Sequence, residues 1–236
     1  MASQEDVFDK ISRFLAKREG IDKTLKVLRY SARLAVALGP KDQDLTKRLS
    51  SFEKSVGVSR KAVRFGKFLQ DVNSLRHSKT KDATVILELL SYGGEGVYYF
   101  IEQFTWLVKT GALNKDLEGR LALASAVAEL VGYVGSIWLK FHKLQKLINQ
   151  EKDMVDQLQK LRKDEIVVDV KLESALASLR FQRNLCCALI LQDIADSVMA
   201  LNDVTNGRVN GLNHPAVLAL AGLTSGCISF YKNWNL

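Results

Sequence analysis

The chain has only two prolines, Pro40 and Pro215, among its 236 residues. Because proline ends or kinks a helix, this scarcity leaves the helical repeat of apolar residues almost uninterrupted. Strand-like alternation bounded by tight-turn dipeptides is also largely missing, which argues against a β-sheet protein. The composition is 47% hydrophobic, which excludes a generally disordered chain. We therefore expect an all-α protein.

Residues that could carry catalysis or bind a metal are also few. There are three cysteines, two of them adjacent at Cys186 and Cys187, and all lie in apolar helical contexts. We interpret them as reduced packing residues. None of the three histidines, His77, His142 and His214, has a metal-ligand partner four residues away. No nucleophile elbow, phosphate loop or dinucleotide fingerprint occurs. We expect no enzymatic activity, no metal and no cofactor.

Positive charge is concentrated in the first third of the chain. Residues 1–80 hold 18 Lys and Arg against 9 Asp and Glu, whereas residues 81–236 hold 16 against 17, so the net charge of +8 arises in the first third. Such an asymmetry predicts an anionic partner, either nucleic acid or an acidic lipid surface. We favour lipid, because no zinc-ligand spacing and no stacking motif for single strands accompanies the basic residues.

The most informative stretch, residues 54–76, reads as one basic amphipathic helix, which the preceding helix could enter directly or through a bend at Gly57. Its apolar face would carry Val58, Ala62, Phe65, Leu69 and Val72, and its opposite face would carry Arg60, Arg64 and Lys67. A helix of this kind lies in a membrane interface, with apolar side chains among lipid tails and cations at anionic headgroups. Its insertion would wedge one leaflet apart and favour curvature.

The glutamates of the next segment, residues 83–108, also carry information. Glu88, Glu95 and Glu102 recur at seven-residue spacing in an otherwise apolar stretch. A charge at the bilayer centre costs roughly 2.5–3.5 kcal/mol on insertion scales, so three on one stripe argue against a simple membrane span. We expect this helix to turn its glutamates towards water or arginines. The side expected to face lipid or the core carries Tyr98, Phe100, Phe104 and Trp106.

Composition divides the chain into four helical regions. Residues 1–80 form the basic N-terminal region, residues 81–141 the apolar aromatic helices, residues 142–183 a charged, water-exposed region, and residues 184–236 the C-terminal helices. We expect a membrane-associated bundle in which residues 121–141 and 213–231 are candidate membrane helices, the second being short against the roughly 20 residues of a full span. Gly222 and Gly226 in the second would permit close helix contact, with dimerisation through them left open.

Four segments, which together span most of the chain, carry a family resemblance. They are residues 20–30, 59–67, 94–106 and 214–234. In these segments the chain resembles the peroxin eleven family, the peroxisomal membrane proteins that elongate and proliferate peroxisomes. The resemblance adds Lys61 to the predicted headgroup side of the amphipathic helix and Phe68 to its predicted lipid side.

The resemblance implies a protein of the peroxisomal membrane with its N-terminus in the cytosol. It implies that amphipathic-helix insertion remodels and elongates this membrane and promotes peroxisome proliferation and fission. It also implies a homo-oligomer that helps to bring fission machinery, a dynamin-like GTPase with its membrane adaptor, to the organelle. Two alternatives stay open: a pore or channel for small metabolites, with the three glutamates facing water, and a soluble helical adaptor whose apolar faces pack on one another.

Overall fold

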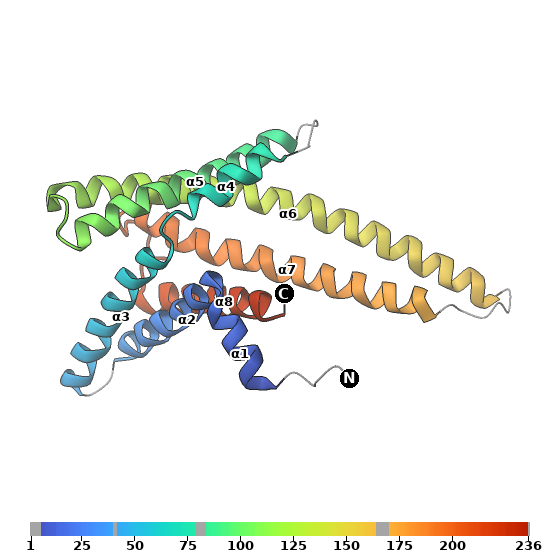
Figure 1. Ribbon diagram of the computed structural model, residues 1–236, viewed down its shortest axis with the longest axis horizontal. Helices are drawn as coiled ribbons and strands as arrows, with labels where there is room; N and C mark the ends of the chain where they lie inside the picture. Colours follow the sequence, from blue (N-terminus) through green and yellow to red (C-terminus); the bar gives the residue numbers. More distant parts are fainter. Residues whose placement is uncertain (1–5, 40–41, 79–83, 164–169, 236) are drawn as a thin grey trace.

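The computed structural model describes residues 6–39, 42–78, 84–163 and 170–235 as a set of packed helices (Figure 1). The helices are α1 (Val7–Ala16), α2 (Arg18–Ala37), α3 (Gln43–Val63), α4 (Phe68–Arg76), α5 (Thr84–Lys109), the short 3-10 helix η1 (Lys115–Leu117), α6 (Glu118–Lys163), α7 (Val170–Val204) and α8 (Pro215–Trp234). No strand occurs within these ranges, which confirms the all-α expectation. The boundary expected between residues 80 and 81 lies outside them.

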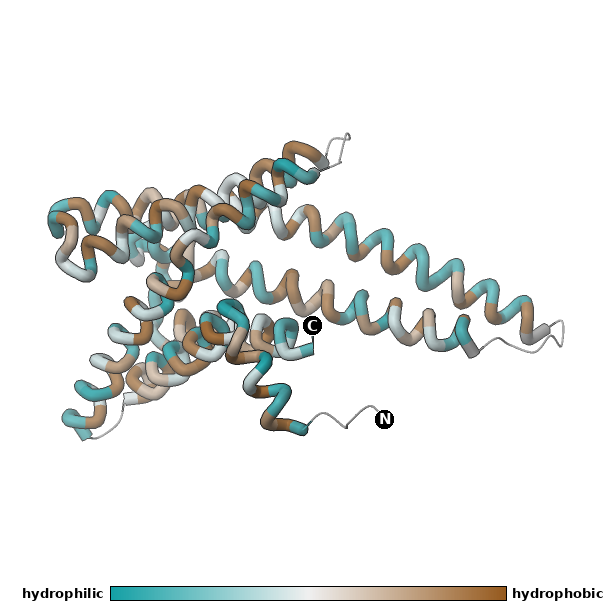
Figure 2. Tube along the Cα trace, in the orientation of Figure 1, coloured by the Kyte–Doolittle hydropathy of each residue, from teal (hydrophilic) through white to brown (hydrophobic). Residues whose placement is uncertain are grey.

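The helices form a continuous series of packed neighbours. α5 packs along α6, α6 along α7, α7 against α8, α8 against α2, and α2 against α3, while α4 lies on α5. The two ends of the chain therefore meet, and Figure 1 shows the blue α2 beside the red α8. The long pair of α6 and α7 projects well beyond the other helices, and Figure 2 shows hydrophilic residues recurring along the outer half of α6.

Two helices in the C-terminal half, α6 and α7, are long and apolar enough to cross a membrane. α6 contains the candidate membrane segment at residues 121–141, whereas α8, which corresponds to the candidate at residues 213–231, is not one of these two helices. In the sequence of α7, Asp193 and Asp196 interrupt the apolar stretch. Both carboxylates lie inside the bundle, where Asp193 pairs with Lys140 and Asp196 with Lys26. The two acids therefore do not prevent the rest of α7 from presenting an apolar exterior.

The single helix expected over residues 54–76 is wrong in its middle. α3 ends at Val63 and α4 begins at Phe68, with a turn between them. Gly66 in this turn has a φ of 72°, a left-handed conformation that glycine adopts without steric strain. At Gly57, where a bend was one expectation, α3 continues unbroken. The apolar residues expected on one continuous helix face are therefore divided between α3, the turn and α4.

Glycines allow two pairs of helices to pack closely against each other. A Cβ atom on Gly94 of α5 would lie 2.5 Å from the backbone nitrogen of Gly132 in α6. A Cβ atom on Gly222 of α8 would lie 2.2 Å from Cδ1 of Tyr30 in α2, and one on Gly226 would lie 3.3 Å from Val27 Cγ2. Gly222 and Gly226 thus pack against a helix of the same chain, so dimerisation through them would have to displace α2.

We predict that Gly94→Ala destabilises the protein although its neighbour Gly93→Ala does not. Alanine is preferred over glycine in a helix by about 1 kcal/mol, so both changes favour α5 itself. A Cβ atom on Gly93 meets only Leu89 Cδ1 at 3.8 Å, whereas one on Gly94 collides with α6, and overpacking of this kind costs about 1–3 kcal/mol. Unfolding temperatures of the two variants in detergent test this, and equal temperatures would contradict the close α5–α6 contact.

Candidate functional site: an ion-lined cavity and an outer apolar surface

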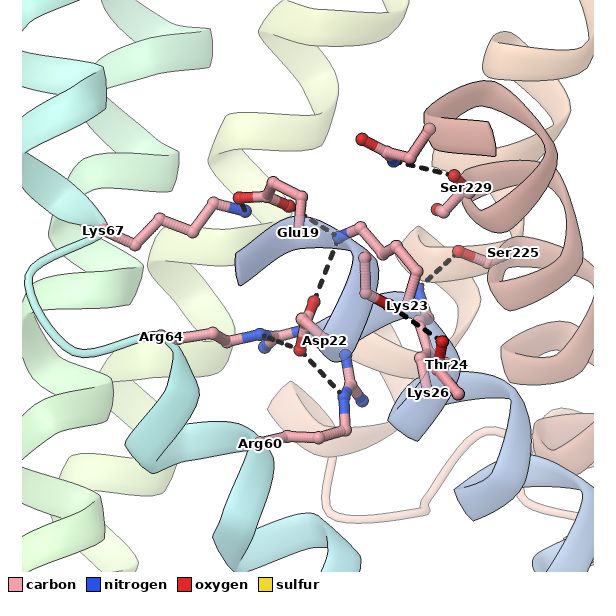
Figure 3. Close-up of polar contacts among 12 residues, drawn as sticks. Glu19, Asp22, Lys23, Thr24, Lys26, Arg60, Arg64, Lys67, Ser225 and Ser229 are labelled. Carbon is pink, nitrogen blue, oxygen red and sulfur yellow. Dashed lines mark hydrogen bonds and ion pairs between the residues drawn. The ribbon is translucent and has the colours of Figure 1, made fainter. Parts of the chain in front are cut away.

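The basic side of the 54–76 segment points into the bundle. Arg60 Nε donates a hydrogen bond to Asp22 Oδ1 at 3.0 Å, and Arg64 Nε donates to the same oxygen at 2.9 Å. Asp22 is 2% exposed and Arg60 5% exposed, so both groups are shielded from water. One carboxylate of α2 thus holds a guanidinium of α3 and a second one in the turn that follows it (Figure 3).

A second carboxylate, Glu102 of α5, receives the other side of this cluster. Lys61 Nζ donates to Glu102 Oε1 at 2.9 Å. Arg64 Nη1 donates to the Tyr98 hydroxyl at 3.1 Å, and this hydroxyl donates to Glu102 Oε1 at 3.1 Å. Arg64 therefore bridges α2 and α5 and ties the turn between α3 and α4 to both helices.

Lys67 completes the set of four cations predicted to face headgroups. Its Nζ donates to the Tyr99 hydroxyl at 2.7 Å and lies 3.5 Å from Glu19 Oε1. The structure therefore brings all four predicted cations together around carboxylates and tyrosines of the same chain. Contact between them and lipid headgroups stays a prediction.

Part of this arrangement was expected from the sequence. The spacing of Glu95 and Glu102 indicated a stripe turned towards water or arginines, and both residues line the interior of the bundle. Asp22 was missed, because its local sequence resembles that of any polar helix position. The signal that could have found it is the excess of cations in residues 1–80, which must be paired if they are buried.

The protein environment favours the charged form of Asp22 but disfavours the charged form of Lys26. Burial alone would raise the pKa of Asp22, but the neighbouring guanidiniums of Arg64 and Arg60 outweigh burial and keep this pKa well below its ordinary value. Lys26 Nζ donates to Asp196 Oδ1 at 2.9 Å, joining α2 to α7, and it also donates to the hydroxyl of Ser225. Burial lowers the pKa of Lys26 to about 8 despite the attraction of Asp196.

These ion pairs line a cavity of about 640 Å³ among α2, α3, α5, α6, α7 and α8. Its wall contains eleven Lys and Arg and eight Asp and Glu side chains, and its volume lies in the range of small-ligand sites. In the described part of the chain no three His, Cys, Asp or Glu side chains are placed to hold a metal ion. Charged residues turned to the bundle interior, with apolar residues outside, are the arrangement expected of a membrane protein.

The apolar side of the same segment faces outward. Phe65 is 61% exposed and Leu69 59% exposed. Ring contacts join this side to α5: the centroids of Phe65 and Trp106 are 6.4 Å apart, and those of Phe68 and Phe100 are 5.4 Å apart. We call the resulting patch the outer apolar surface, and it comprises Phe65, Phe68, Leu69, Val72, Phe100 and Phe104.

The outer apolar surface joins two segments that the sequence analysis kept apart. Val58, Ala62 and Phe68 are half-buried, whereas Phe65, Leu69 and Val72 are exposed. On α5, Phe100 and Phe104 face outward, whereas Tyr98 faces the cavity. The aromatic residues of α5 therefore divide between the exterior and the interior, a division that their order along the chain does not indicate.

We predict that Asp22→Asn lowers the stability far more than Asp44→Asn. Removing the charge of Asp22 leaves buried cations without their partner, and breaking a buried pair costs about 3–5 kcal/mol. Asp44 pairs with Arg48 on the exposed surface of α3, where a pair contributes about 0–1 kcal/mol. Unfolding of the detergent-solubilised protein by titration with sodium dodecyl sulfate measures both losses. Equal losses would show that the Asp22 cluster does not hold the fold.

Known relatives of the chain are named peroxisomal membrane proteins. The family model of Peroxisomal biogenesis factor 11 (PEX11) matches residues 8–234. The chain is 46% identical to peroxisomal membrane protein 11-3 of Oryza sativa subsp. japonica, over 98% of this chain and 90% of the relative. It is 40% identical to peroxisomal membrane protein 11A of Arabidopsis thaliana, over 97% and 93%. No solved structure matches it. The chain therefore belongs to the PEX11 family, and it is a membrane protein of the peroxisome.

Proposed function

We propose that the chain remodels and elongates the peroxisomal membrane, and so promotes peroxisome proliferation and fission, by seating its outer apolar surface in one leaflet. The observation that carries this proposal is the outward exposure of Phe65 and Leu69 beside the exposed rings of α5. Burying apolar area is worth roughly 25 cal/mol per Å², so lipid is the favourable environment for such a surface. Bulky side chains that enter one leaflet only would expand it and favour curvature.

In this proposal the inward-facing cations hold the turn that carries Phe65 rigidly against the bundle. Arg64 binds both Asp22 and Glu102, and Lys67 binds Tyr99, so the turn that carries Phe65 is fastened on its polar side. Because the polar side of this turn is held inside the bundle, its apolar residues stay on the outer surface. Insertion would then draw its free energy chiefly from apolar burial, which salt screens little, and less from attraction to headgroups.

We predict that Phe65→Glu in the full-length chain abolishes membrane tubulation, whereas Asn73→Glu leaves it intact. Both positions are exposed and both changes add one negative charge near α4, but only Phe65 belongs to the outer apolar surface. Liposomes containing anionic phospholipid, imaged by electron microscopy, give the tubule length for each variant. Tubules of normal length with Phe65→Glu would overturn the mechanism.

We propose that the protein has partners of three kinds. The membrane partner is an anionic phospholipid surface, which the positive first third of the chain supports. The same charge excess supports a cytosolic N-terminus, because basic residues favour that side. Further partners are other copies of the chain in a homo-oligomer and the fission machinery, a dynamin-like GTPase and its membrane adaptor. We propose no nucleic-acid partner.

The ion-lined cavity favours a second candidate function, a pore or channel for small metabolites. Charged side chains inside a membrane bundle commonly mark a path for solutes. Ser125 of α6 lines the cavity, whereas its neighbour Ala124 is exposed on the other side.

If the cavity conducts, we expect discrete current steps in a planar bilayer that Ser125→Phe reduces and Ala124→Phe does not. The unfolding temperature of each variant confirms that it is folded. Wild-type protein without current steps would exclude the pore and leave the remodelling proposal untouched.

A further inference from the structure

Cations outnumber carboxylates around the cavity. Eleven Lys and Arg and eight Asp and Glu line it, and two further carboxylates pair with lining cations, Asp22 with Arg60 and Glu53 with Arg29. The cations therefore exceed the carboxylates by one, and Lys26 and Arg60 among them are buried. Such a surplus is unfavourable in a low-dielectric interior unless an opposite charge joins it.

One donor of this cluster has no partner. Arg60 donates through Nε to Asp22, but its buried Nη2 makes no hydrogen bond with any described residue. A buried donor left unsatisfied costs about 1–3 kcal/mol, and more when the group is charged. Figure 3 shows Arg60 reaching towards Asp22 from α3 while Lys23 and Lys26 extend from α2. The unpartnered nitrogen belongs to a side chain that lines the cavity.

A second cation enters the cavity from α8. Within the described ranges Lys232 makes no hydrogen bond or ion pair, and its side chain is half-buried. Burial lowers the pKa of Lys232, and the nearby ammonium groups of Lys140 and Lys23 lower it further, against the weaker opposing effect of Glu95 and Glu19. The ammonium groups of Lys140 on α6 and Lys23 on α2 thus lie close enough to repel that of Lys232.

We propose that the cavity binds a small anion that carries phosphate or carboxylate groups, with Arg60 and Lys232 among the cations that hold it. Arg60 Nη2 would gain the acceptor that it lacks, and the repulsion among the lysines would be relieved. Charge-assisted hydrogen bonds of guanidinium and ammonium groups to such oxygens are about twice as strong as neutral ones. A cavity of about 640 Å³ has room for a multivalent metabolite or a lipid headgroup. This site goes beyond membrane remodelling and does not depend on it.

The test measures the unfolding temperature of the full-length protein in a non-ionic detergent. One arm titrates inorganic phosphate at constant ionic strength, with chloride as the balancing ion. The other arm adds phosphatidic acid to the detergent micelles at zero phosphate. A ligand that binds only the folded state raises the unfolding temperature in a saturable manner.

Two variants and one control locate the effect. We expect Lys232→Met to raise the half-saturating ligand concentration at least tenfold, and Lys152→Met, an exposed change on α6 outside the cavity, to leave it unchanged. Arg60→Lys keeps the charge beside Asp22 but removes Nη2, so it also raises the half-saturating concentration if the variant folds.

The two arms distinguish the sources of the anion. Stabilisation by inorganic phosphate that Lys232→Met weakens supports a free anion, and stabilisation by phosphatidic acid alone with the same sensitivity supports a lipid headgroup. If neither probe gives a rise that depends on Lys232, the proposal is overturned. That result would leave the tubulation test of the outer apolar surface unaffected.

Discussion

Asp22 accepts hydrogen bonds from Arg60 and Arg64 in a position where water has almost no access. Because an unpaired charge is very costly in such a place, these contacts fix α2 against the end of α3. Arg64 extends the same connection to Glu102 and so to α5. These contacts set the orientation of the whole 54–76 segment. Because its cations are held inside the bundle, Phe65, Phe68 and Leu69 lie on the outer side.

The bundle as a whole repeats this division between a polar interior and an apolar exterior. Lys26 and Asp196 pair between α2 and α7, and Lys140 and Asp193 pair between α6 and α7. Between α5 and α6, and between α8 and α2, glycines replace large apolar side chains at the closest contacts. Helices in lipid associate through small residues and polar contacts because burial of apolar surface gives no advantage there. These features agree with the membrane location of the family.

The sequence predicted the helical class and the positions of α5 and α8, because the 3.6-residue repeat is local information. It also placed the cations of the 54–76 segment opposite Phe65 and Leu69, and the structure turns these two groups to different sides of the bundle. It could not show which face turns inward, since that depends on Asp22 and Glu102, which lie about 40 residues away along the chain on other helices. The break at Gly66 was missed because one glycine inside a helical pattern costs only about 1 kcal/mol and many helices tolerate it.

The length of α6 has a geometric consequence. Its 46 residues extend about 69 Å at 1.5 Å per residue, whereas the hydrocarbon core of a bilayer is roughly 30 Å thick. If α6 crosses a bilayer along its length, its charged outer half and the part of α7 packed along it extend several nanometres beyond the hydrocarbon core. In that orientation, a second membrane or large particle approaching on this side would meet the paired ends of α6 and α7 before it reached the lipid.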